Sequence, residues 1–146
     1  MSDGIEPRAE TRLEISLQFS NGARLGPDEL RVIVAVRRAR SILGASRVAG
    51  FSYRTCWLIV DALNRAFETP VIATFPGRRG GGAELTPFGE RLIALYGSIE
   101  RRARAQAKPA LDEVSAALNS TWRRRSSDGE LGAARSERAP RRLQGS

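Results

Sequence analysis

Apolar and polar residues alternate at every position of the segment LEISLQF, residues 13–19. A period of two is typical of a β-strand with one buried face, so this segment predicts a strand. Asn21-Gly22 comes next, and Asn-Gly is the preferred pair for a tight hairpin turn. We therefore expect ordered structure to begin at Leu13 and residues 23–25 to pair back against the strand.

From Pro27 the apolar positions recur at helical spacing. Proline suits the first position of a helix, and Asp28 and Glu29 are favourable in its first turn. This helix should run through LRVIVAVRRA. We expect its core-facing residues to be Leu30, Ile33, Val34 and Val36, with Arg37, Arg38 and Arg40 near its end.

Residues 41–64 predict two short helices joined by a tight turn at Gly50, with Ser52 as the N-cap of the second helix. An inward stripe of that helix would comprise Cys56, Ile59, Val60, Leu63 and Phe67. The outward face would comprise Tyr53, Arg54, Trp57 and Asn64. Such a face suits base edges and phosphates, whereas an ordinary helical hairpin with a half-buried Trp57 explains the same pattern.

A second hairpin is predicted where the β-branched run 71–75 precedes the loop PGRRGGG, and residues 83–86 return. The loop has the size of the wing in a winged helix-turn-helix domain, with Arg78 and Arg79 at its tip. Its three consecutive glycines could indicate a phosphate-binding loop, but the Gly-Lys-Ser/Thr ending is absent. An ordinary flexible loop is the remaining alternative.

The longest helix should start at Thr86-Pro87, with threonine as N-cap. Its apolar ladder is longer than one small domain can cover, which favours a dimer seam. The seam residues would be Phe88, Leu92, Leu95, Tyr96 and Ile99. Pro109 should kink or end this helix, leaving residues 110–118 as a separate short helix or a bent continuation.

Composition narrows the possible functions of this 146-residue chain, which has a net charge of +8, no histidine and one cysteine. Histidine-based catalysis, a cysteine-rich zinc site and an intrachain disulfide are excluded. No run of about 18 apolar residues exists for a membrane span, and no secretory signal opens the chain, so we expect a cytoplasmic protein. Residues 31–79 carry nine arginines and two acids, which favours a phosphate-bearing partner there, although a solvated face is the simpler alternative.

These residues resemble a known family. The pattern SIxxAxxxxGFSYRxxWxxVDxLN, followed by GRRGGGAELTPFGERLIALY, is similar to the N-terminal DNA-binding domain of the ModE family, a winged helix relative of the LysR-type domain. The resemblance implies a dimer that binds a two-fold symmetric operator and places the Ser52-Tyr53 helix in the major groove. It also suggests a role in molybdenum uptake or use.

Three features depart from the family pattern. The wing opens Ala73-Thr74-Phe75-Pro76-Gly77 where Ala-Thr-Gly-Gly is usual. Leu43 stands where the first helix of the motif usually has a serine cap, a loss of about 1 kcal/mol. Only 28 residues follow Leu118, too few for the family's molybdate-binding module, so we expect a stand-alone form.

The sequence thus predicts a mainly α fold with small β, a winged helix-turn-helix with an N-terminal β-hairpin and a long C-terminal dimerisation helix. Residues 1–12 would be a flexible arm, residues 13–118 the DNA-binding domain and residues 119–146 a disordered basic tail. The DNA-binding residues would be Arg47, Ser52, Tyr53, Arg54, Thr55, Trp57, Arg78 and Arg79. We expect a homodimeric transcriptional regulator without catalytic activity, cofactor, metal or bound molybdate. The alternative is a protein-interaction module that uses the long helix and the basic tail.

Overall fold

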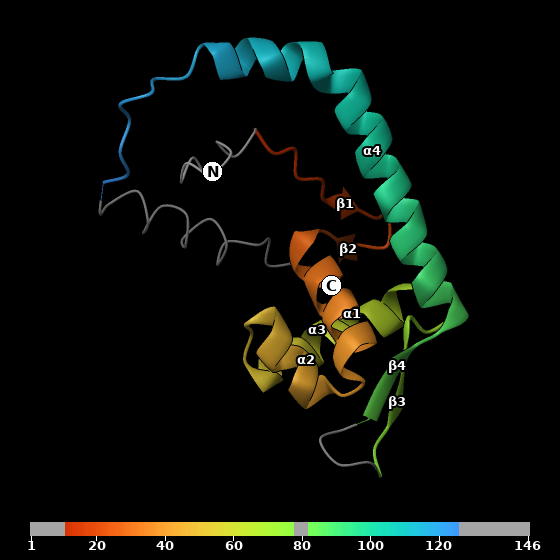
Figure 1. Cartoon of the computed structure of the whole chain (residues 1–146). Coiled ribbons are helices and arrows are strands. Elements are labelled where there is room, and N and C mark those ends of the chain that lie inside the picture. The colour runs from red at the N-terminus through yellow and green to blue at the C-terminus, as the bar shows by residue number, and fades with distance from the viewer. Residues whose placement is uncertain (1–10, 78–81, 126–146) are drawn as a thin grey trace, which may run out of the picture. The chain divides into compact units, whose positions relative to one another are not determined.

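A computed structural model of the chain describes residues 11–77 and 82–125. It is mainly helical with two small antiparallel hairpins, which confirms the predicted fold class at that level (Figure 1). The elements are β1 (Leu17–Gln18), β2 (Arg24–Leu25), α1 (Pro27–Ala39), α2 (Ile42–Ala49), α3 (Tyr53–Ala66), β3 (Ile72–Phe75), β4 (Gly82–Leu85) and α4 (Pro87–Ala116).

Internal contacts divide the chain into two units, Met1–Leu111 and Asp112–Ser146. In the second unit, Asn119 Oδ1 accepts hydrogen bonds from the backbone and the hydroxyl of Thr121, at 2.9 and 2.7 Å. The predicted tail from residue 126 and the arm up to residue 10 lie outside the described residues. In the part of the chain that the structure describes, no helix has the length and apolar character needed to cross a membrane.

The first hairpin is shorter than the alternation in LEISLQF predicted, because β1 spans only Leu17–Gln18. Leu17 pairs with Leu25 and Gln18 with Arg24. Burial nevertheless alternates throughout residues 13–19, with every second side chain half-buried. The returning strand is cut short when Pro27 starts α1, so residues 13–16 have no strand to pair with. The alternation correctly predicted which side chains of this segment are half-buried. It overestimated the length of the hydrogen-bonded strand.

The turn of this hairpin is a three-residue loop at residues 20–22. Phe19 N–H donates to Ala23 C=O at 2.8 Å, and Gly22, at φ 88°, adopts the left-handed conformation that this loop class requires. Asn21 therefore does not serve as the first residue of a two-residue Asn-Gly turn. Its side chain instead donates to Ala66 C=O at 2.9 Å, which ties the hairpin to the end of α3.

Helix α1 begins at Pro27 as predicted, and the Glu29 carboxylate accepts hydrogen bonds from Gly26 N–H at 3.2 Å and Arg24 Nε at 2.9 Å. Val34 was wrongly assigned to the core, because its side chain is 41% exposed. The apolar residues of α1 that are buried on its wide inner face are Val32, Ile33, Ala35 and Val36. The inner face is wide because α1 packs against both α2 and α3.

A serine does cap α2, contrary to the departure expected at Leu43. Arg40 adopts a left-handed conformation at φ 58°, so that α2 starts directly afterwards at Ile42. Ser41 Oγ accepts a hydrogen bond from Gly44 N–H at 2.9 Å. The cap residue lies two positions earlier than expected, and no cap is lost.

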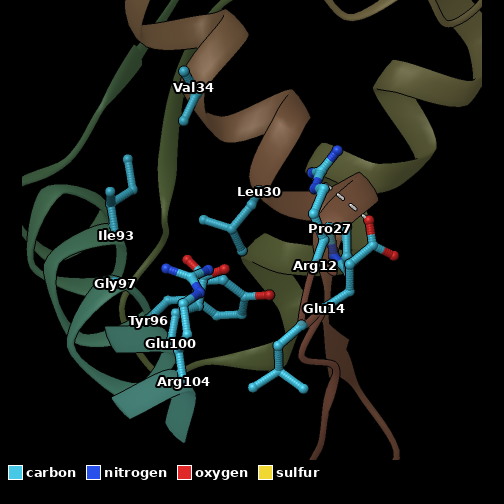
Figure 2. A pocket seen from close by; sticks show the side chains of 11 residues that line it. Arg12, Glu14, Pro27, Leu30, Val34, Ile93, Tyr96, Gly97, Glu100 and Arg104 are labelled. Carbon is cyan, nitrogen blue, oxygen red and sulfur yellow. Dashed lines mark ion pairs between the residues drawn. The ribbon is translucent and has the colours of Figure 1, made fainter. Parts of the chain in front are cut away.

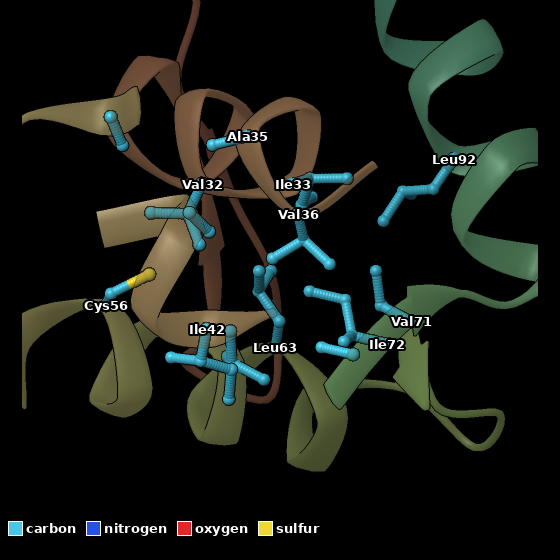
Figure 3. Packing of buried hydrophobic residues seen from close by; sticks show 14 of the residues in the cluster. Val32, Ile33, Ala35, Val36, Ile42, Cys56, Leu63, Val71, Ile72 and Leu92 are labelled. Carbon is cyan, nitrogen blue, oxygen red and sulfur yellow. The ribbon is translucent and has the colours of Figure 1, made fainter. Parts of the chain in front are cut away.

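Buried apolar side chains from all the larger elements of the first unit form one cluster between α1, α2, α3 and the β3–β4 hairpin (Figure 3). Leu63 from α3, Ile72 from β3 and Leu92 from α4 are examples of these contributions. Because every helix of this unit contributes to the same cluster, each helix is held in a fixed orientation by what it buries.

Asn64 was wrongly placed on the outward face of α3. Its Oδ1 accepts hydrogen bonds from the backbone N–H groups of Val71 and Ile72, at 3.0 and 2.9 Å, and its Nδ2 donates to Ile72 C=O at 2.8 Å. The amide thus satisfies buried backbone groups where β3 begins and joins α3 to the second hairpin.

The second hairpin is antiparallel as predicted, with β4 beginning at Gly82, one residue earlier than expected. Thr86 caps α4 by accepting from Gly89 N–H at 3.0 Å. Helix α4 continues through Pro109 to Ala116, so of the two predicted alternatives the separate short helix is wrong and the chain continues as one helix. Gly89 permits a close approach of α4 to the hairpin, because a Cβ there would lie 2.3 Å from Val71 O.

We expect Gly89→Ala to lower the free energy of unfolding by about 1–3 kcal/mol, since the new methyl group meets backbone that cannot move aside freely. Gly97→Ala is the matched control on the same helix, because its Cβ would meet only the flexible tip of Arg101 at 3.1 Å. Urea denaturation measures both variants. Equal midpoints would contradict the close-approach interpretation.

Asn64→Ala should cost about 2–3 kcal/mol of stability, because two buried backbone N–H groups lose their acceptor. Asn119→Ala removes the same amide from an exposed local turn and should change stability by less than about 0.5 kcal/mol. Urea denaturation measures both variants. Similar losses of stability in the two would contradict the claim that the Asn64 amide stabilises the fold through its bonds to Val71 and Ile72.

Candidate nucleic-acid interface

Helix α3 presents a polar and aromatic face to solvent because its opposite face is buried. Cys56, Val60 and Leu63 are buried, as predicted, and fix the rotation of the helix. Tyr53 and Trp57 are then each 47% exposed on the other side, one turn apart. The structure therefore brings the predicted outward residues together, except for Asn64.

The first turn of α3 is closed by Ser52, whose Oγ accepts from Thr55 N–H at 3.1 Å and donates to Thr55 Oγ1 at 2.9 Å. Both side chains are exposed, as is Arg47 near the end of α2. Gly50, at φ 76°, makes the turn between the two helices, as its position in the sequence predicted. The predicted residues that the structure describes in this unit are thus all exposed, near the end of α2 and in the first turns of α3: Arg47, Ser52, Tyr53, Arg54, Thr55 and Trp57.

Four of the described arginines are paired with carboxylates, and none of the four belongs to this surface. Arg65 binds Asp61 at 3.0 Å, and Arg37 binds Glu90 at 3.3 Å. Within residues 11–77 and 82–125, neither Arg47 nor Arg54 has a carboxylate within ion-pair distance. Their charges are therefore available to an anionic partner. Arg78 and Arg79 lie outside the described residues.

The second hairpin is held next to α2 and α3 by backbone contacts as well as by Asn64. Ala83 N–H donates to Arg40 C=O at 3.1 Å, and Gly82 forms a bridge with Ser41. Phe75 and Gly82 are the last pair of the hairpin before its loop. Strand β4 is thus tied by its backbone to the residues between α1 and α2.

The predicted seam residues on α4 fall into two groups. Leu92 and Tyr96 are buried within the chain, and Phe88 is half-buried against Phe67, with ring centroids 5.2 Å apart. Leu95 and Ile99 are 42% and 40% exposed. Only this second pair is left for contact with another molecule.

A groove of about 310 Å³ lies between α1, α4 and the segment before β1 (Figure 2). Leu30, Val34 and Ile93 give it apolar walls, and the Tyr96 hydroxyl donates to Ile15 C=O beside it. Burial raises the pKa of Tyr96, and the nearby carboxylates of Glu100, Glu14 and Glu29 raise it further. No local sequence pattern predicted this groove, because its walls come from three separate segments.

The lone cysteine is an unpromising reactive group. Burial raises the pKa of Cys56, which keeps the thiol neutral. In the described part of the chain, no three histidine, cysteine or acidic side chains are grouped so that they could hold a metal ion.

No protein-family model matches the chain. Among known proteins it is similar to the molybdenum-pterin-binding protein MopA of Rhodobacter capsulatus, with 38% identity over 112 residues, 74% of this chain and 42% of that protein. MopB of the same organism is 46% identical over 80 residues, 54% of this chain and 30% of MopB. The molybdenum transport protein ModE of Azotobacter vinelandii is 34% identical over 106 residues, 72% of this chain and 38% of that protein.

The chain spans about two fifths of the length of MopA and less of the other two proteins. Proteins named as the transcriptional regulator ModE are also similar, including that of Haemophilus influenzae at 28% identity, over 62% of this chain and 36% of that protein. The chain is thus a homologue, over part of their length, of the molybdenum-related Mop proteins and ModE regulators.

Proposed function

We propose that this chain is a sequence-specific, double-stranded DNA-binding transcriptional regulator with a winged helix-turn-helix fold. The observation that supports this most is the outward face of α3, where Arg54 stands between exposed Tyr53 and Trp57 without a carboxylate partner among the described residues. Base edges and phosphates offer such a face the acceptors and apolar contacts that it lacks in the free chain. In this proposal α3 enters the major groove.

The elements around α3 fit roles in the same complex. Helix α2 would cross the DNA backbone, with Arg47 near a phosphate, as the first helix of such motifs does. Ser52 and Thr55, at the start of α3, offer hydroxyl groups to the backbone. The β3–β4 hairpin would be the wing, with Arg78 and Arg79 reaching phosphates or the minor groove.

The names of the relatives extend the proposal to a biological role. Several are called transcriptional regulators or molybdenum transport proteins. We therefore propose that the chain acts in the cytoplasm on genes for molybdenum uptake or use.

A homodimer follows from the same proposal. Leu95 and Ile99 form an exposed apolar pair one turn apart on α4, and a second copy would remove this pair from water. Two copies would present two α3 helices to a two-fold symmetric site.

The same exposed residues also suit a protein-interaction module, which is the alternative function. Salt dependence separates the two. Duplex binding should weaken steeply between about 50 and 200 mM salt because bound counterions are released. Salt-insensitive binding to a protein, without duplex binding, would favour the interaction module.

Arg54→Ala should weaken binding to the preferred site by about 1–3 kcal/mol and change binding to random duplex little, because a base contact is lost. Arg65→Ala is the charge-matched control near the other end of α3, where the arginine is paired with Asp61. Fluorescence anisotropy with both duplexes measures the effect. Arg78→Ala with Arg79→Ala should instead weaken binding to both duplexes, and the opposite pattern would contradict the assignment of helix and wing.

Ile99→Glu should convert the dimer to a monomer in sedimentation experiments, because a carboxylate would be buried in the apolar seam. It should also weaken binding to the two-fold site, since two linked half-sites gain from effective concentration. Val48→Glu, the same kind of change at an exposed apolar position on α2, is the control for the sedimentation experiment and should stay dimeric. A dimeric Ile99→Glu variant would place the seam elsewhere.

This chain should not bind molybdate by itself. An oxyanion needs fixed N–H, hydroxyl and basic donors that replace its hydration. The groove beside Tyr96 offers Arg12 and Arg104, but Glu14 and Glu100 line it as well. Titration calorimetry with molybdate, and with sulfate as control, should show no saturable heat. Micromolar binding of molybdate alone would contradict this expectation.

A further inference from the structure

The first two turns of α3 expose mostly apolar side chains around one cation, Arg54. Tyr53, Trp57 and Leu58 are each 47% exposed, and they follow one another at spacings of four and one along the helix. Leu58 is not among the residues that the sequence pattern placed on this outward face. Together the three side chains form an apolar surface beside Arg54, which we call the α3 apolar face.

The side chains that usually read adenine and cytosine are missing from this face. Adenine is read by Asn or Gln and cytosine by Asp or Glu, and none of these occurs in residues 53–60. Asp61, one turn further on, is paired with Arg65 at 3.0 Å. Asn64 is held by the backbone of β3. The first two turns of α3 therefore retain one strong hydrogen-bonding reader, Arg54, which suits guanine.

The major-groove edge of thymine carries a C5-methyl group, the apolar contact in an otherwise polar set of base edges. Contact with this methyl group would cover apolar surface that α3 otherwise exposes to water. Resting on the function proposed above, we propose that the α3 apolar face recognises thymine through its C5-methyl group, next to a guanine bound by Arg54.

The test replaces thymine with deoxyuridine, which lacks only the methyl group and keeps every hydrogen-bonding group. A preferred duplex is first selected from random sequences, and each thymine is then replaced in turn. We expect about a fourfold loss of affinity at one or two positions in each half-site, the change expected for one apolar carbon left unburied. At the same positions, 5-methylcytosine should bind more tightly than cytosine by a similar factor.

Protein variants assign the effect to residues. In Trp57→Ala or Leu58→Ala, the ratio of the affinities for the thymine and the uracil duplex should fall towards one at a sensitive position. Val114→Ala, an exposed apolar change on α4 outside the proposed interface, should leave this ratio unchanged. Both α3 residues are half-exposed, and circular dichroism verifies that the variants fold.

If uracil is tolerated at every position while selective binding persists, this proposal fails and the DNA-binding function stands. If none of the variants changes the ratio, the α3 apolar face is not the reader. If the chain selects no duplex at all, both proposals fail.

Discussion

Three hydrogen bonds from the Asn64 amide hold α3 and the second hairpin in one fixed relation. The backbone groups that they satisfy belong to Val71 and Ile72, which are fully or almost fully buried, so the amide cannot be replaced by water there. Gly89 then allows α4 to start against the same strand end, since its missing side chain leaves room for Val71 O. One short stretch, at the start of β3, thus sets the positions of α3, the hairpin and α4.

The candidate interface depends on this arrangement more than on any residue within it. Tyr53, Arg54 and Trp57 face outward because Cys56, Val60 and Leu63 are buried on the opposite side. The hairpin is tied to the same body through Arg40 and Ala83. A preformed surface of this kind loses little conformational entropy on binding, which favours affinity.

Local signals in the sequence predicted much of the fold and of the candidate interface. Gly50, Ser52 and Thr86 were recognised because turns and caps depend on one or two residues. Errors arose where a side chain's role depends on distant partners. Asn64 fits the outward face by spacing, but it bonds to residues seven and eight positions away. Val34 lies at a core spacing yet faces the groove, and Ser41 became the cap because Arg40 turns the chain at an unusual φ.

The central claim is that α3 contacts DNA, and the two tryptophans of the chain allow a direct test. Trp57 lies on α3, whereas Trp122 lies after α4, and both are exposed. Fluorine NMR of the chain labelled with 5-fluorotryptophan, with resonances assigned from a Trp57→Phe variant, follows both sites during titration with the preferred duplex. The account predicts a large, saturable shift of the Trp57 resonance. A bound complex in which Trp57 is unchanged would contradict it.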